Sequence, residues 1–215
     1  MVNLPPKFYT SHIYNGSHLE SIPKGKTSVE FFIDYNCPFS GKIFRKLDGE
    51  IIPLLKKKGI LEKFEITLVN VIQPWHHINS GTSHEVALAV ANAYPDQFWK
   101  FSSVLFENIE SFYDTETYNL TRKQLYEKLI KLAVDNLNGV SAQKLWELVE
   151  IKPSADGKPS NAGNLLAKDV KYFTRYHRTL GVHVTPTVTV NGIVFNQIES
   201  STDAAKVVEI LEGQL

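Results

Sequence analysis

The sequence contains a single cysteine, Cys37, in 215 residues, so no disulfide can form within the chain. One thiol is also too few for a typical thiolate zinc site. Proteins without disulfides are most common where thiols are kept reduced, and we therefore expect a cytoplasmic protein. Cys37 has to act alone if it carries chemistry. The alternative is that it packs as a small apolar side chain.

The sequence also has no excess of either charge, because Lys+Arg and Asp+Glu both number 23. A neutral chain argues against nucleic acid as a partner and against a basic membrane-binding surface. No apolar run is long enough to span a bilayer. Residues 1–18 lack the apolar segment of a secretion signal, so we expect none. The apolar fraction of 43% is sufficient for one large core.

The first third of the chain predicts a β-α-β unit. Residues 28–33 and 64–71 are apolar and β-branched, as in strands that are buried on both faces. Between them, apolar side chains recur at helical spacing over residues 43–55, and Pro53 is expected to divide this helix. Two strands joined in this way form a parallel pair with a right-handed crossover.

The remainder predicts a helical block followed by a return to the sheet. Residues 83–148 show helical patterns throughout, with Ser83, Thr121 and Ser141 as expected helix caps, and residues 152–161 form a polar turn. Residues 164–180 predict one more helix. Two β-rich runs then meet at Asn191-Gly192, a strong hairpin signal. A final helix follows, with Thr202 or Asp203 as its cap.

Cys37 lies where the first strand meets the first helix. Pro38 suits the first turn of a helix, where its missing N–H is not needed. A cysteine at the beginning of a helix lies near the positive end of the helix dipole, which favours the thiolate. The position of Cys37 therefore makes it a candidate nucleophile.

Two separated motifs resemble those of one family. Phe32, Asp34-Tyr35 and Cys37-Pro38-Phe39 resemble the active-site motif of the DsbA-like thiol oxidoreductases. Far down the chain, Thr185-Pro186-Thr187 and Val190-Asn191-Gly192 resemble the cis-proline loop and following hairpin of the same family. The resemblance implies an α/β, thioredoxin-like fold with an all-helical insertion, the DsbA-like topology.

The resemblance also implies a domain division and a substrate site. Residues 1–82 and 162–215 would form the thioredoxin-like domain, and residues 83–161 the inserted helical domain. The Thr185-Pro186 peptide would be cis and would face Cys37 across a groove. Its backbone would pair with an extended peptide or with glutathione, while Pro38 and Phe39 would contact the substrate beside Cys37.

The sequence departs from this family at two positions. Redox members carry a second cysteine where this chain has Ser40, so Cys37 has no resolving partner within the chain. We expect the Ser40 hydroxyl to donate a hydrogen bond to the sulfur. Phe39 stands where many members have histidine, which removes a cation from the site. A mixed disulfide on Cys37 would then need glutathione or another thiol for its release.

Residues 73–77, QPWHH, leave the second strand at the sheet edge where α/β proteins bind ligands. Trp75 is expected to wall a pocket, and His76 or His77 to bind or protonate a substrate. The alternative is that Trp75 packs on the helices and both histidines face water. The spacing of these histidines and His84 matches no zinc pattern, so no metal is expected. His183 either reaches the groove or lies on the surface.

Three functions follow from these observations. The first is a single-cysteine, DsbA-like thiol-disulfide oxidoreductase that uses glutathione as a co-substrate and binds no cofactor. The second is a glutathione-dependent transferase or isomerase related to the kappa-class transferases, which activate glutathione with a hydroxyl at this helix terminus. The third is a thioredoxin-like module that binds peptides without chemistry. The oligomeric state is left open, and a homodimer is compatible with the sequence.

Overall fold

A computed structural model describes residues 4–16 and 25–215; residues 1–3 and 17–24 of the predicted thioredoxin-like part lie outside the described residues. A four-stranded sheet has the order β2-β1-β3-β4. Its strands are β1 (Thr27–Ile33), β2 (Phe64–Asn70), β3 (Thr187–Val190) and β4 (Ile193–Val194). β1 is parallel to β2 and antiparallel to β3, and β3 is antiparallel to β4. The predicted β-α-β unit and the hairpin are therefore confirmed.

β1 and β2 are buried on both faces along most of their length, as their apolar sequences predicted. Their crossover consists of α2 (Pro38–Lys46), a π-helical turn (Leu47–Ile51) and α3 (Ile52–Lys57). Pro53 lies in the first turn of α3, directly after the π-helical turn. The crossover helix is therefore divided at the proline, because that residue cannot donate to the preceding turn.

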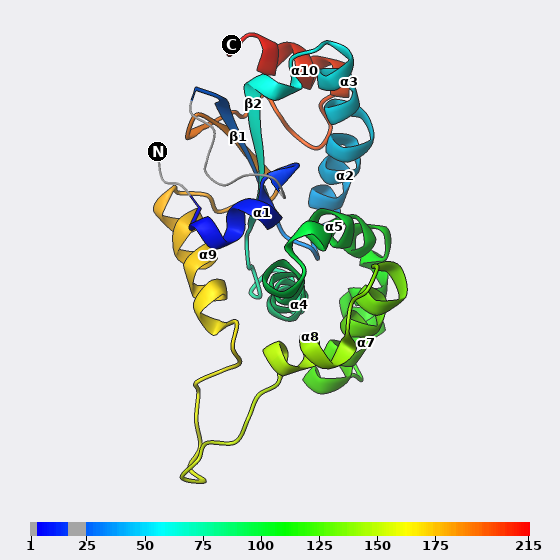
Figure 1. Ribbon diagram of the computed structural model, residues 1–215, viewed down its shortest axis with the longest axis vertical. Helices are drawn as coiled ribbons and strands as arrows, with labels where there is room; N and C mark the ends of the chain where they lie inside the picture. Colours follow the sequence, from blue (N-terminus) through cyan, green and yellow to red (C-terminus); the bar gives the residue numbers. More distant parts are fainter. Residues whose placement is uncertain (1–3, 17–24) are drawn as a thin grey trace.

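Five helices follow one another after β2. They are α4 (Ser80–Ala93), α5 (Phe98–Glu107), α6 (Asp114–Thr117), α7 (Arg122–Asn136) and α8 (Ala142–Val149). Short 3₁₀ turns lie at Pro6–Phe8, Leu61–Lys63, Pro95–Gln97 and Ile109–Phe112. Figure 1 shows α4, α5, α7 and α8 gathered at one end of the sheet. The block therefore caps that end rather than covering a face.

The first helix of this block begins earlier than predicted. α4 starts at Ser80 rather than at Ser83, since the Ser80 hydroxyl accepts a hydrogen bond from the Gln73 backbone at 2.9 Å. This bond draws the loop after β2 onto the first turn of α4. Two other expected caps are confirmed: Thr121 forms a capping box with Gln124, and the Ser141 hydroxyl accepts from the Lys144 backbone. Asp203 takes the N-cap position of the last helix, as predicted, but its side chain makes no capping hydrogen bond.

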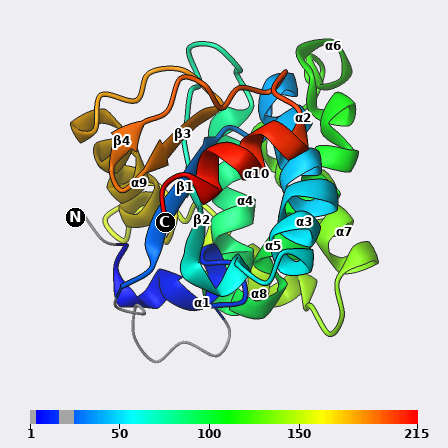
Figure 2. The same cartoon turned by 90° about the horizontal axis from the view of Figure 1, so that it is seen from above.

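The remaining helices lie on the two faces of the sheet. α1 (Tyr9–His12) and α9 (Ala167–Thr179) lie on one side of the strands, and α2, α3 and α10 (Ala204–Glu212) lie on the other (Figures 1 and 2). α9 begins three residues after the predicted start, because the Asn164 side chain accepts from the Leu166 backbone and forms a turn there. The segment between α8 and α9 projects away from the body (Figure 1).

The β3–β4 hairpin turns at Asn191-Gly192, where both residues have positive φ values of 50° and 80°. A two-residue turn of this kind needs residues that tolerate the left-handed region, which explains the sequence signal. Over residues 4–16 and 25–215, no helix is both long enough and apolar enough to cross a membrane.

Candidate active site

Cys37 is the residue that precedes the first turn of α2. Its backbone is extended, with φ −87° and ψ 118°, and Pro38 takes the first helical position. The Cys37 N–H donates to the Asp34 carbonyl at 3.0 Å, and the Cys37 carbonyl accepts from the Gly41 N–H at 3.1 Å. These bonds place the sulfur at the N-terminal end of the helix, where the dipole favours a negative charge.

The chain segment opposite Cys37 lies 148 positions further along the sequence. The Cys37 thiol donates to the Thr185 carbonyl at 3.4 Å, and the Thr185-Pro186 peptide bond is cis. The cysteine is 3% exposed and Thr185 is also buried. The fold therefore brings together the two motifs that the sequence analysis singled out.

Ser40 does not have the hydrogen bond expected of it. Its side chain is fully buried, and its hydroxyl accepts from the Asp34 N–H at 3.2 Å. Among the described residues, no hydrogen bond joins the Ser40 hydroxyl to the Cys37 sulfur. The expected donation to the sulfur is wrong, because the Ser40 side chain points back to the turn between β1 and α2.

Pro38 and Phe39 lie at the surface beside the buried sulfur. Phe39 is 61% exposed, although it is large and apolar. An exposed aromatic ring next to a reactive group is available to pack against a bound partner. Their assignment to substrate binding stays a prediction.

Gln73 links the loop after β2 to the cis-proline loop, a role that sequence reasoning missed. Its side-chain nitrogen donates to the His183 carbonyl at 3.0 Å, and its side-chain oxygen accepts from the Thr185 hydroxyl at 2.9 Å. Gln73 is only 3% exposed. A buried amide with both ends bonded fixes Thr185 against Cys37. A lone glutamine in a polar loop carried no sequence signal for this role.

Trp75 and His76 lie at the surface of the same loop. Trp75 is 61% exposed, and the Arg178 guanidinium of α9 lies 5.5 Å from its ring. His76 is exposed and packs against the His77 ring at 4.3 Å between centroids. Within the described residues, no hydrogen bond or ring contact joins Trp75 or His76 to Cys37. His183 is exposed, and its carbonyl meets Gln73.

A pocket of about 250 Å³ adjoins the active-site turn. Its lining residues are Asn36, Pro38, His77, Ile78, Asn79, Phe112, Tyr113 and Asp114. The side chains of Asn36 and Asn79 both donate to the Phe112 carbonyl, at 3.1 and 3.0 Å. Burial lowers the pKa of His77, which favours the neutral form of its ring. The inserted helices therefore supply one wall beside Cys37.

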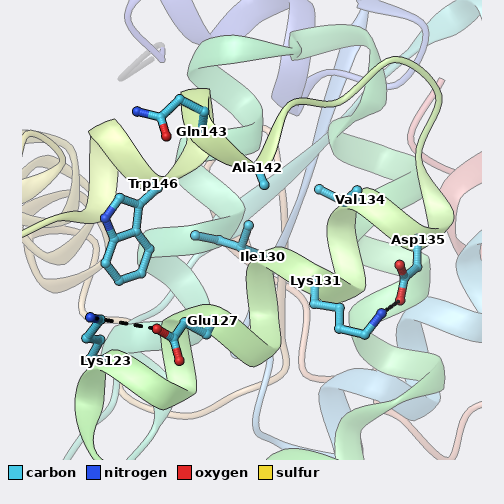
Figure 3. A pocket seen from close by; sticks show the side chains of 9 residues that line it. All are labelled: Lys123, Glu127, Ile130, Lys131, Val134, Asp135, Ala142, Gln143 and Trp146. Atoms are coloured by element: carbon cyan, nitrogen blue, oxygen red, sulfur yellow. Dashed lines mark hydrogen bonds and ion pairs between the residues drawn. The ribbon is translucent and has the colours of Figure 1, made fainter.

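A second hollow, of about 610 Å³, lies away from this site between α7 and α8. Figure 3 shows its apolar floor, which includes Ile130, Val134 and Trp146. Charged side chains at its rim are paired, since Lys123 meets Glu127 and Lys131 meets Asp135 (Figure 3).

Glu30 is a buried carboxyl on β1. It accepts hydrogen bonds from the Tyr176 hydroxyl of α9 and, at 2.9 Å, from the Thr189 hydroxyl of β3. Burial raises the pKa of Glu30, because the charged form loses its hydration. Over the described ranges there is no group of three or more His, Cys, Asp or Glu side chains that could hold a metal ion.

Comparisons with known proteins give no sequence match but a clear structural one. No protein-family model and no curated protein matches the chain. A proposed protein-disulfide isomerase from Pseudomonas syringae has a similar structure, with a TM-score of 0.67 and 24% identity. The match covers 87% of this chain and 94% of that one.

Two further structures show the same similarity. BdbD from Bacillus subtilis matches with a TM-score of 0.61 and 25% identity, over 89% of this chain and 88% of that one. MdbA, a thiol-disulfide oxidoreductase from Actinomyces oris, matches with a TM-score of 0.59 and 18% identity, over 88% and 81%. The sheet order, the helical block and these similarities agree: this chain has the DsbA-like thioredoxin fold.

Proposed function

We propose that this protein catalyses thiol-disulfide exchange through Cys37 alone. One observation carries the proposal: the Cys37 sulfur lies at the N-terminal end of α2, 3.4 Å from the Thr185 carbonyl that precedes cis Pro186. A helix terminus favours the thiolate, which is the form that attacks disulfides. The activities named for the structurally similar proteins support the same chemistry.

The exchange needs no resolving cysteine in the chain. The Cys37 thiolate attacks one sulfur of a substrate disulfide, a new S–S bond forms to Cys37, and the other substrate sulfur leaves as a thiolate. A second thiol then attacks the substrate sulfur of this mixed disulfide and releases Cys37 as a thiolate. Ser40 cannot take that second role, so an external thiol must do so. We propose glutathione for it.

The exposed residues near Cys37 are where we expect a substrate to bind. Val184, which precedes Thr185, is 69% exposed, and Phe39, two residues after Cys37, is 61% exposed. An extended substrate would lie between them, with its backbone beside Thr185 and Pro186 and its apolar side chains on Phe39. Extended backbone against an exposed loop edge is a common mode of peptide binding.

The proposal is tested by incubating the folded protein with oxidised glutathione and measuring its mass. We expect one glutathione on Cys37 and its release by reduced glutathione. Cys37→Ser is the control and should take up none. A wild-type protein that stays unmodified while folded would contradict the proposal.

A peptide-binding module without chemistry is the second candidate, and the burial of the sulfur favours it. Cys37 is 3% exposed and its thiol is already bonded to the Thr185 carbonyl, so a disulfide can reach the sulfur only if the residues that cover it move. The two functions differ in their dependence on the sulfur. Peptide binding that is unchanged in Cys37→Ala, together with no mixed disulfide in the wild type, would establish the module instead.

A further inference from the structure

A chain of buried polar side chains runs from the N-terminal segment to the active-site turn. It consists of Ser11 and His12 in α1, Asn70 at the end of β2, His84 in α4 and Asp34 just after β1. None of the five is more than 1% exposed. Successive contacts measure 2.7, 2.8, 2.8 and 3.6 Å. The function proposed above gives these five side chains no role, although Asp34 belongs to the turn that holds Cys37.

His12 is neutral in this chain of contacts. Its ring is stacked between Phe98 and Phe173, with centroid distances of 4.2 and 4.9 Å. Complete burial lowers the pKa of His12 to about 3. The ring therefore carries a single N–H at neutral pH, and its two nitrogens play opposite parts, one as donor and one as acceptor.

The contacts determine which atom donates and which accepts in each hydrogen bond. The Asn70 side-chain oxygen faces His12 Nε2 at 2.8 Å, so that nitrogen carries the hydrogen. His12 Nδ1 then accepts from the Ser11 hydroxyl. The Asn70 side-chain nitrogen donates to His84 Nδ1 at 2.8 Å. A neutral His84 ring must therefore carry its hydrogen on Nε2, the nitrogen that faces Asp34.

Asp34 shapes the turn that holds Cys37. Its carboxylate accepts from the Asn36 N–H at 2.9 Å, its own N–H donates to Ser40, and its carbonyl accepts from the Cys37 N–H. The carboxylate is fully buried, and among the described residues its Oδ2 has no hydrogen-bond partner. A buried carboxylate is stable only when donors or cations face it. His84 Nε2 lies 3.6 Å from Oδ1 and faces the carboxylate from α4; the contact is longer than a hydrogen bond, and Nε2 has no other hydrogen-bond partner among the described residues.

We propose that His84 is a positioning residue for Cys37, oriented through Asn70 and His12 so that its Nε2–H faces Asp34 and holds the active-site turn. The inference rests on the proposed function only in taking Cys37 as the reactive group. The titratable groups around His84 are Asp34, His12, His177 and Tyr35, whose ring centroid lies 4.8 Å away.

Two variants separate the donor from the bulk of the ring. His84→Gln keeps an N–H donor at about the place of Nε2, whereas His84→Leu keeps volume without a donor. The matched control is Val86→Ala, a fully buried position in the same helix. The thermal midpoint of Val86→Ala measures the stability lost to a packing defect in α4. Its rate of Cys37 alkylation then shows whether such a defect alone affects the active site.

The readout is the rate of Cys37 alkylation by iodoacetamide, measured from pH 5 to pH 10 on the folded protein. We expect His84→Leu to slow alkylation at pH 7 by about tenfold and to shift the pH profile, because the sulfur loses its placement at the helix terminus. His84→Gln should stay within about twofold of the wild type, and Val86→Ala should not change the profile. An unchanged profile in folded His84→Leu, or equal slowing in His84→Gln, would overturn the inference.

A second measurement needs no variant. The ¹⁵N shifts of the histidine rings in the wild-type protein show which nitrogen carries the hydrogen. We expect the Nε2–H form for His84, and a hydrogen on Nδ1 instead would overturn the inference even if His84→Leu fails to fold. Alkylation and ring shifts need no disulfide substrate. A wild type that forms no mixed disulfide would therefore contradict the proposed function alone.

Discussion

The active-site turn and the α7–α8 helix pair are stabilised by contacts of different range. In the helix pair, Thr121 bonds to Gln124 three positions away, and Lys131 pairs with Asp135 four positions away. At the active site, Cys37 meets Thr185 across 148 positions and Gln73 meets Thr185 across 112. The local sequence predicts the short-range contacts of the helix pair, whereas the long-range contacts of the active site form only when the chain folds.

The two regions also differ in what a lost contact costs. Exposed helix pairs contribute about 0.2–0.5 kcal/mol each, because water competes for the same groups. A buried polar group that loses its partner costs about 1–3 kcal/mol, because no water replaces the partner. Substitutions at the active-site turn should therefore have larger effects than matched substitutions in α7.

The largest effect on activity is expected for Ser40→Cys. A second thiol in the first turn of α2 would supply the resolving group that Cys37 lacks, so an internal disulfide can form and be passed to substrates. We expect oxidation of a dithiol peptide to become at least about tenfold faster than with the wild type. An unchanged rate in a folded variant would show that position 40 cannot reach the sulfur.

Asn70→Leu should lower the free energy of unfolding by about 3 kcal/mol, because it leaves His12 Nε2 and His84 Nδ1 without a partner inside the protein. Urea unfolding measures this loss. The matched control is Asn136→Leu, an exposed position of α7 where the side chain donates to the Leu132 carbonyl. There we expect a change within about 0.5 kcal/mol. Equal losses at both sites would contradict the comparison.

The buried His12 ring should make the free energy of unfolding depend on pH. Burial lowers its folded-state pKa from 6.5 to about 3, so between these values the unfolded chain binds a proton that the folded chain does not. The contribution of His12 to the free energy of unfolding is therefore fully present above pH 6.5. It falls by about 1.4 kcal/mol per pH unit as the pH decreases toward 3. Denaturant unfolding across this range measures the slope. His12→Gln should reduce the slope, and replacement of the exposed His183 by Gln serves as its control.

The smallest effect belongs to the cap of α7. Thr121→Ala removes the hydroxyl that accepts from the Gln124 N–H and should cost about 1 kcal/mol. Urea unfolding measures the loss, and alkylation of Cys37 should stay at the wild-type rate. Thr121→Ser keeps the hydroxyl and is the matched control. Slower alkylation in Thr121→Ala would show that the helix pair and the active site are coupled.

Local signals predicted a large part of the fold. The Asn191-Gly192 turn, the Thr121 cap and the division at Pro53 all follow from the backbone preferences of single residues or pairs. The boundaries of α4 and α9 were wrong by three residues. In both cases a side-chain bond in the adjoining loop, at Ser80 and at Asn164, decided where the helix begins.

The active site was predictable only in outline. Cys37 and Thr185-Pro186 were identified as one site because two motifs resemble one family, and the structure places them in contact. The hydroxyl of Ser40 was assigned to the wrong partner, since a sequence does not say which way a buried side chain points. Gln73 had no pattern of its own to mark it.

The sequence by itself determined that one thiol stands at the beginning of a helix with no second cysteine to resolve its disulfides. These are properties of composition and of neighbouring residues. Only the tertiary structure decided that His12, Asn70 and His84 lie in one buried line behind Asp34. Three elements, α1, β2 and α4, supply the members of that line, and they meet because burying their apolar neighbours forces unsatisfied polar groups to bond with one another.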